Sequence, residues 1–169
     1  MGGLGRLRTR LDGGYLLKLQ ITPGGGASFD CAGHFGPDCA PATPKWRHRF
    51  AADWDTPLAG FSTGVTWRYF GEANNELTST GFPSSNPAQA AAGRPDSRIP
   101  TVSYIDLRAS YTWEKYTIRV GCNNVADKDP PLFDTITSGG NSTFAESNTY
   151  PSMYDTAGRY LYLNITADF

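Results

Sequence analysis

Apolar and polar side chains alternate in about six separate segments of the chain, a period-two pattern typical of β-strands with two different faces. In KWRHRFAADWDT, for example, Trp46, His48 and Phe50 fall on one side, and Arg47 and Arg49 fall on the other. The stretch from Leu4 to Ile21 and the segments FSTGVTWRYFG, YIDLRASYTW, YTIRVGCNN and RYLYLNITADF follow the same rule. The pattern predicts an all-β fold, an antiparallel up-and-down meander of about six long strands.

The connections between these segments differ in length. TPLAG and Glu114–Lys115 are short turns, whereas long connections are expected over residues 22–44, 72–100 and 124–158, the second of them a stretch of low order. Outer-membrane barrels show this asymmetry, with short turns on the periplasmic side and long loops outside. The pattern therefore favours a transmembrane β-barrel whose last strand ends on Phe169. A soluble β-sandwich or meander, which alternates in the same way, remains the alternative.

Composition argues against a nucleic-acid-binding protein and against a helical membrane protein. The formal net charge is -1 and the arginines are spread along the chain, so no nucleic acid partner is expected. No run of about 18 apolar residues occurs, which argues against a helical membrane span. The mean hydropathy of -0.41 does not argue against a barrel, because barrel strands average lipid-facing and lumen-facing side chains. The start, MGGLGRLRTRLDGG, lacks the apolar core of an export signal, so either the protein is cytoplasmic or that segment is missing.

The reactive residue types form no catalytic or metal-binding pattern. Cys31 and Cys39 bracket AGHFGPD, and both a disulfide and two free thiols are compatible with that spacing. Cys122 occupies the position of a small apolar residue. His34 and His48 are the only histidines, and neither lies in a Ser/His/Asp, Cys/His or metal-ligand spacing. We expect no enzyme activity and no cofactor.

The final third of the chain resembles the end of TonB-dependent outer-membrane receptors. It contains, in order, an aspartate-containing strand, a strand ending in Asn-Asn, an Asp-Lys-Asp-Pro-Pro segment and a Tyr-Asp-x-x-Gly-Arg motif before a strand with a terminal aromatic. These are Asp106, Asn123, Asn124, Asp127, Asp129, Pro130, Tyr154, Asp155, Gly158, Arg159 and Phe169. The stretch around PKWRH and the cysteine loop also look like one subgroup of these receptors.

The resemblance implies a location in the bacterial outer membrane and a part in TonB-coupled uptake of a scarce solute, such as an iron chelate, vitamin or saccharide. Partners would be membrane lipid, the barrel-insertion machinery that reads Phe169, the solute, and the TonB system acting through a plug. Residues 1–169 are expected to be a carboxyl-terminal fragment that lacks plug and signal peptide, and not transport-competent alone. The alternative function is a small self-standing or oligomeric β-barrel or β-sheet binding protein.

The strand alternation also predicts which side chains face the lumen and which lie at a membrane boundary. Polar residues expected to line the lumen are Arg47, Arg49, Arg68, Asp106, Arg108, Arg119, Asn123 and Tyr162. The aromatic residues Trp54, Tyr111, Trp113 and Phe169 are expected toward one rim, as an interfacial girdle requires.

Overall fold

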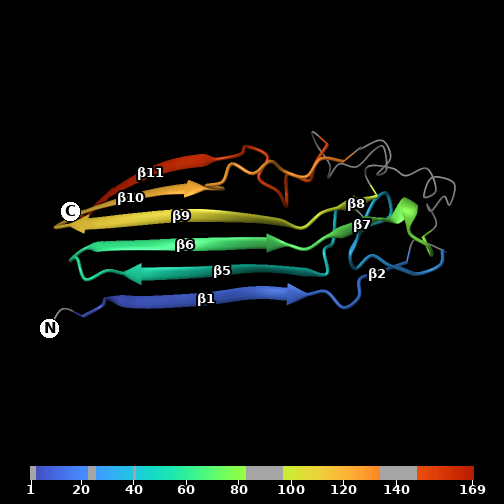
Figure 1. Cartoon of the computed structure of the whole chain (residues 1–169), viewed down its shortest axis with the longest axis horizontal. Coiled ribbons are helices and arrows are strands. Elements are labelled where there is room, and N and C mark those ends of the chain that lie inside the picture. Colours follow the sequence, from blue (N-terminus) through green and yellow to red (C-terminus); the bar gives the residue numbers. More distant parts are fainter. Residues whose placement is uncertain (1–2, 23–25, 40, 83–96, 134–147) are drawn as a thin grey trace.

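A computed structural model describes residues 3–22, 26–39, 41–82, 97–133 and 148–169. Six long strands form one sheet: β1 (Arg6–Tyr15), β5 (Trp46–Asp55), β6 (Phe61–Phe70), β9 (Val102–Trp113), β10 (Tyr116–Asn123) and β11 (Tyr160–Ala167). Their order in the sheet is their order in the chain, and every neighbouring pair is antiparallel (Figure 1). The predicted all-β, up-and-down meander is confirmed.

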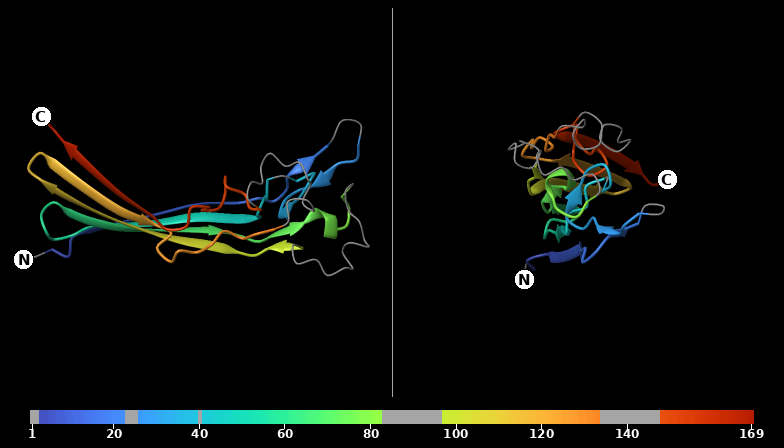
Figure 2. Two further views of the ribbon diagram at one scale, coloured as in Figure 1. Left: turned by 90° about the horizontal axis from the view of Figure 1, so that it is seen from above. Right: turned by 90° about the vertical axis from the view of Figure 1, so that its right-hand side faces the viewer.

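The two ends of the sheet are built differently. Both short turns lie at the end where the two chain termini are found, which we call the turn end (Figure 1). There Thr56 donates its backbone N–H to the carbonyl of Phe61 at 3.1 Å, closing the turn between β5 and β6. The described residues of the three long connections lie at the opposite end, and we call them the cap (Figure 1). Figure 2 shows the sheet curving along its length between these two ends.

The cap is a small folded unit, and the expectation of a low-order stretch over residues 72–100 is wrong for its described part. Two small sheets form there, β2 (Gln20–Ile21) with β3 (Phe29–Asp30), and β4 (His34–Phe35) with β7 (Ala73–Asn75) and β8 (Arg98–Ile99). A 3-10 turn, η1 (Glu76–Thr78), follows β7. β4 and β7 pair in parallel, which brings the first and second long connections together.

Two apolar clusters explain why the cap is ordered. The larger unites all three connections through buried side chains that include Phe35, Ile99, Phe133, Tyr150 and Tyr154. The smaller surrounds Cys31 and Cys39 with Phe29 and Phe82. The burial of these large aromatic side chains removes apolar surface from water, which stabilises the cap.

Two strand limits differ from expectation. The stretch predicted to run from Leu4 to Ile21 is one strand only as far as Tyr15. Leu19 and Ile21 instead pack against the smaller cap cluster, so their apolar character reflects cap burial. The last strand ends at Ala167 and not at Phe169, although Asp168 still donates its N–H to Lys115 O at 2.9 Å.

One face of the six-stranded sheet is apolar and uncovered. The register aligns alternate residues of all six strands, so that Trp54 lies opposite Leu7 and Thr63, and Val120 lies opposite Ala109 and Leu163. Leu161, Leu163 and Ile165 are 72%, 64% and 63% exposed. Among the described residues, no second layer covers them, unlike the inner face of a β-sandwich.

The sheet is open on both sides. Among the described strands, β1 pairs only with β5 and β11 pairs only with β10. The outer edges of these two strands therefore carry backbone groups without a strand partner. No helix within the described part of the chain is long and apolar enough to cross a membrane.

Candidate functional site on the polar face of the sheet

The second face of the sheet gathers the polar side chains. Strand alternation and register put all the residues expected to line a lumen on this one face: Arg47, Arg49, Arg68, Asp106, Arg108, Arg119, Asn123 and Tyr162. Arg6, Arg8, Arg10 and Asp12 of β1 lie on it as well, although the sequence analysis did not single them out. Their alternation with Leu7 and Leu11 in the sequence could have placed them on this face.

Arg68 is the centre of a hydrogen-bonded network at the cap end of this face. Its Nε and Nη2 donate to the two carboxylate oxygens of Asp106 at 2.8 and 2.9 Å. Its Nη1 and Nη2 also donate to Asp155 at 2.9 and 2.5 Å. The guanidinium carbon lies 5.0 Å from the centre of the Tyr104 ring, and the Tyr104 hydroxyl accepts the Asp155 N–H. All three charged side chains are at most a quarter exposed, so these charge-assisted bonds are only weakly screened by water.

The Asn-Asn and Asp-Lys-Asp-Pro-Pro motifs form the exit from β10. Asn124 is fully buried and has a positive φ of 49°. Its Nδ2 donates to Lys128 O and its Oδ1 accepts the Lys128 N–H, both at 2.9 Å. Its own N–H donates to Asp106 at 2.9 Å, which links the motif to the Arg68 network. Asn123 is the last residue of β10, opposite Tyr160, whereas Asp129 is exposed and Pro130 is half-buried beyond the turn.

The Tyr-Asp-x-x-Gly-Arg motif forms the entry to β11. Arg159 donates its backbone N–H to Asp127 Oδ1 at 2.7 Å, so the end of one strand and the start of the next are tied together. Gly158 has φ +68°, and a Cβ there would lie 2.9 Å from the same Asp127 oxygen. This position therefore favours glycine, because of its positive φ and because a side chain would collide with Asp127. We call the Asn124–Lys128 and Asp127–Arg159 bonds the clasp.

Tyr154 anchors the clasp in the cap. It is buried against Phe70 of β6, with ring centres 5.7 Å apart, and burial raises the pKa of its hydroxyl. Asp155 follows it directly and reaches Arg68. The motif residues thus hold the last two strands, the cap and the polar face in one arrangement.

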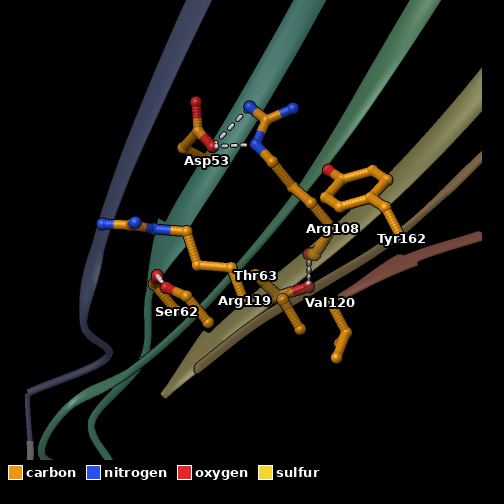
Figure 3. A pocket seen from close by; sticks show the side chains of 9 residues that line it. Asp53, Ser62, Thr63, Arg108, Arg119, Val120 and Tyr162 are labelled. Atoms are coloured by element: carbon orange, nitrogen blue, oxygen red, sulfur yellow. Dashed lines mark hydrogen bonds and ion pairs between the residues drawn. The ribbon is translucent and has the colours of Figure 1, made fainter. Parts of the chain in front are cut away.

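A hollow of about 200 Å³ lies nearer the turn end of the same face (Figure 3). Arg108 donates from Nε and Nη2 to Asp53 Oδ1 at 3.1 and 2.5 Å, and from Nη1 to Thr66 Oγ1 at 2.7 Å. Arg119 and Tyr162 line the hollow, and Figure 3 shows the Arg119 side chain reaching across it past Ser62. Charged and hydroxyl groups here offer hydrogen bonds to a polar solute or to water.

The remaining sequence expectations concern cysteines and histidines. Cys31 and Cys39 form a disulfide within the cap. Cys122 is a free thiol on the apolar face, opposite Leu107 and Leu161. His34 contacts Phe82 in the cap, and His48 stacks on Tyr69 at 5.1 Å. In the part of the chain that the structure describes, no group of three or more His, Cys, Asp or Glu is placed to hold a metal ion.

The aromatic residues of the apolar face lie toward both ends of the strands. Trp54 and Trp113 lie where β5 and β9 end, and Tyr116 lies where β10 begins, all at the turn end. Phe169, which is fully exposed, follows there with Lys115 Nζ 5.2 Å from its ring centre. At the cap end, Tyr15, Trp46, His48, Trp67 and Tyr69 form a chain of ring contacts.

Comparison with known proteins identifies the family. The sequence model of the family described as TonB dependent receptor-like, beta-barrel matches residues 12–125. The chain belongs to this family. TonB-dependent receptors are transporters of the outer membrane, and the match spans β5, β6, β9 and β10 in full together with the end of β1. Searches of curated proteins and of solved structures gave no significant match.

Proposed function

We propose that this sheet is part of the wall of a TonB-coupled receptor that takes up a scarce solute, such as an iron chelate, a vitamin or a saccharide. Its apolar face would contact lipid and its polar face would line the lumen. The observation that carries the proposal is the uncovered apolar face, which alternates residue by residue with a face of paired arginines and aspartates. A bilayer is the solvent that makes such a sheet stable.

The uncovered face is too large for an ordinary water-exposed surface. Large apolar side chains are exposed on every long strand, for example Leu11, Trp54, Leu107, Val120 and Leu163. In water, exposing such surface costs roughly 25 cal/mol per Å², whereas in lipid the same surface needs no cover. The aromatic residues at both ends of the strands support this orientation, because Trp and Tyr favour the boundary between lipid and water.

The free edges of β1 and β11 favour a larger barrel. Unpaired backbone groups cost several kcal/mol each in hydrocarbon, so a lipid-exposed sheet must close on itself. Receptor barrels with a plugged lumen have about 22 strands. We propose that residues 1–169 form a carboxyl-terminal segment of such a wall, with both edges paired to further strands. Arg47, Arg49, Arg68, Asp106, Arg108, Arg119, Asn123 and Tyr162 would then face the plug, the solute or water.

The partners follow from this placement. The cap lies at the end opposite the short turns, where barrels expose their recognition loops, and would help to bind the solute outside the cell. The TonB system would act through the plug to open a passage. Phe169 would be the terminal aromatic that the barrel-insertion machinery reads before the wall enters membrane lipid.

Membrane placement can be tested directly. The complete receptor that carries this sheet is produced in a Gram-negative cell, and membranes are separated on a density gradient. The proposal expects the protein in the outer-membrane fraction, retained after alkaline washing. Recovery in the aqueous fraction without detergent contradicts it, because that behaviour belongs to a soluble sandwich.

Uptake is tested on the complete receptor that carries this sheet. Cells that depend on it are grown on limiting iron chelates, vitamins or saccharides, with and without TonB. Growth that needs both the receptor and TonB supports the proposal. A chain that instead closes alone into a small barrel, detected as a heat-sensitive mobility change in electrophoresis without any other strand, supports the alternative of a self-standing or oligomeric binding protein.

A further inference from the structure

The cap half of the polar face holds two arginines without a counter-charge. Within the described residues, neither the Arg47 nor the Arg49 guanidinium makes a hydrogen bond or ion pair, and both side chains are exposed. They line a hollow of about 460 Å³ together with Asp12, Gly14, Arg68 and Phe70 of the polar face and with Gly13, His48 and Tyr69 of the apolar face. A cavity of this size is in the range that accepts a small ligand.

The neighbours of Arg49 do not bind its guanidinium. Asp12 lies directly opposite it on β1, but the Asp12 carboxylate pairs with Arg10 Nε at 2.7 Å. On the other side Arg49 faces Arg68, whose two carboxylate partners are Asp106 and Asp155. Among the described residues, the Arg49 guanidinium therefore keeps its donors available for a ligand.

Arg47 is also placed without a protein partner. Its opposite residues are Gly14 on β1 and Phe70 on β6, and neither offers a hydrogen-bond acceptor from a side chain. A Cβ on Gly14 would have no heavy atom within 4 Å, so the space beside Arg47 is open. Two arginine side chains thus line one open hollow, and neither guanidinium makes a hydrogen bond or ion pair with the described residues.

We propose that the Arg47–Arg49 hollow is a binding subsite for an anionic solute bearing carboxylate or phosphate groups. Guanidinium groups bind these anions through two parallel hydrogen bonds, which gives both attraction and orientation. The inference rests on the proposed function, because it assigns the subsite to the lumen side of the wall. It specifies that the solute is anionic, whereas the proposed function does not specify the charge of the solute.

Arginine enrichment on the whole face supports this charge. Arginines outnumber aspartates on the long strands of the polar face, where Arg6, Arg8, Arg10, Arg47, Arg49, Arg68, Arg108 and Arg119 stand with Asp12, Asp53, Asp55 and Asp106. The chain as a whole carries a net charge of -1. Positive charge is therefore concentrated on the side that a solute would meet, and it would attract anions from a distance.

The test uses the complete receptor that carries this sheet, folded in detergent micelles, with citrate and inorganic phosphate as probes and glycerol as an uncharged control in calorimetric titrations. Wild type is expected to bind the anions and not glycerol. Arg47→Gln combined with Arg49→Gln is expected to raise the citrate Kd by about ten-fold or more, since charge-assisted hydrogen bonds are lost. The matched control combines Arg6→Gln with Arg8→Gln, which removes the same charge from the same face at the turn end. Its Kd is expected to change by less than about two-fold.

Thermal unfolding provides a second readout. Without citrate, Arg49→Gln is expected to unfold at about the same temperature as wild type, because the Arg49 guanidinium makes no hydrogen bond or ion pair with the described residues. Citrate is expected to raise the unfolding temperature of wild type and not that of the double variant. This measurement also establishes that the variants fold.

Three results would overturn the inference: no anion binding by wild type, an equal loss in both double variants, or a lower unfolding temperature for Arg49→Gln. The second would indicate a diffuse field, and the third would make Arg49 a structural residue. Each can occur in a chain that enters the outer membrane normally. Failure to enter that membrane, in contrast, counts against the proposed function.

Discussion

Arg68 of β6 and Asp106 of β9 are joined by two nearly parallel hydrogen bonds, although 38 positions separate them in the sequence. The second acidic partner of Arg68, Asp155, comes from the cap. One guanidinium group therefore fixes two wall strands and the entry to a third. The three charged side chains are at most a quarter exposed, so water screens these charge-assisted bonds only weakly.

Asp106→Asn is expected to lower the free energy of unfolding by about 2 kcal/mol, because a charge-assisted bond is lost and the Arg68 charge loses a partner. Urea titration in lipid vesicles, followed by circular dichroism, measures this. The control is Asp55→Asn, which breaks the exposed Arg8–Asp55 pair and should cost less than about 1 kcal/mol. Equal losses for the two variants would show that burial does not strengthen the Arg68 pair.

Leu163→Arg is expected to cost about 2–4 kcal/mol in lipid vesicles, since it puts a charge near the middle of β11 on the apolar face, which the proposed function places against lipid. Asn164→Arg, one residue later on the polar face, should cost about 0–1 kcal/mol. The pair differs only in the face that carries the charge. A reversed order of the two costs, measured by equilibrium unfolding, would mean that the faces are assigned the wrong way round.

Gly60→Ala is expected to destabilise the β5–β6 turn by about 1–3 kcal/mol. Gly60 has φ +78°, and an added Cβ would lie only 2.2 Å from the backbone carbonyl oxygen of Thr112. Gly14→Ala is the control, because its Cβ would meet nothing within 4 Å, and its effect should stay within about 0.5 kcal/mol. Thermal unfolding compares both, and a neutral Gly60→Ala would show that the turn can relax.

Phe169→Ala is expected to reduce the amount of folded receptor in the outer membrane, whereas Phe169→Tyr should restore most of it. Phe169 is fully exposed and in phase with the apolar face, so the folded sheet loses little packing with it. Quantitative immunoblotting of membrane fractions measures the amount, with Asp168→Ala as control. If Asp168→Ala lowers the amount as much as Phe169→Ala, the chain end and not the aromatic ring matters.

The cap is expected to loosen in acid. Burial lowers the pKa of His34, with a smaller contribution from Lys45, so the folded cap prefers the neutral imidazole. A group whose pKa is lowered on folding adds stability above its unfolded pKa of about 6.5, and this stability is lost as the pH falls through the folded value. Hydrogen exchange of cap amides measured from about pH 7.5 to about pH 5 should show faster opening at the acid end. His34→Gln should remove that dependence, and an unchanged pH profile in this variant would assign it to another group.

The six long strands could be predicted from sequence because each has one apolar and one polar face, which gives a two-residue period. In β5 and β11, for example, the sequence of the strand alone shows which side chains share a face. The cap could not be predicted in this way, since Ala73, Ile99 and Tyr150 become buried only by meeting one another across the fold. The same limit applied to the candidate site: the face of Arg68 was predictable, but its bond to Asp155, 87 positions away, was not.

The clasp fixes the register of β11 at its entry. Asp127 accepts the N–H of Arg159, and Phe133 donates its N–H to the carbonyl of Asn148, so the last long connection is closed near its ends. Loop closure entropy grows only slowly with length, and an insertion there adds little cost once the ends are fixed. An insertion between Phe133 and Asn148 is therefore expected to leave the pairing of β10 with β11 unchanged.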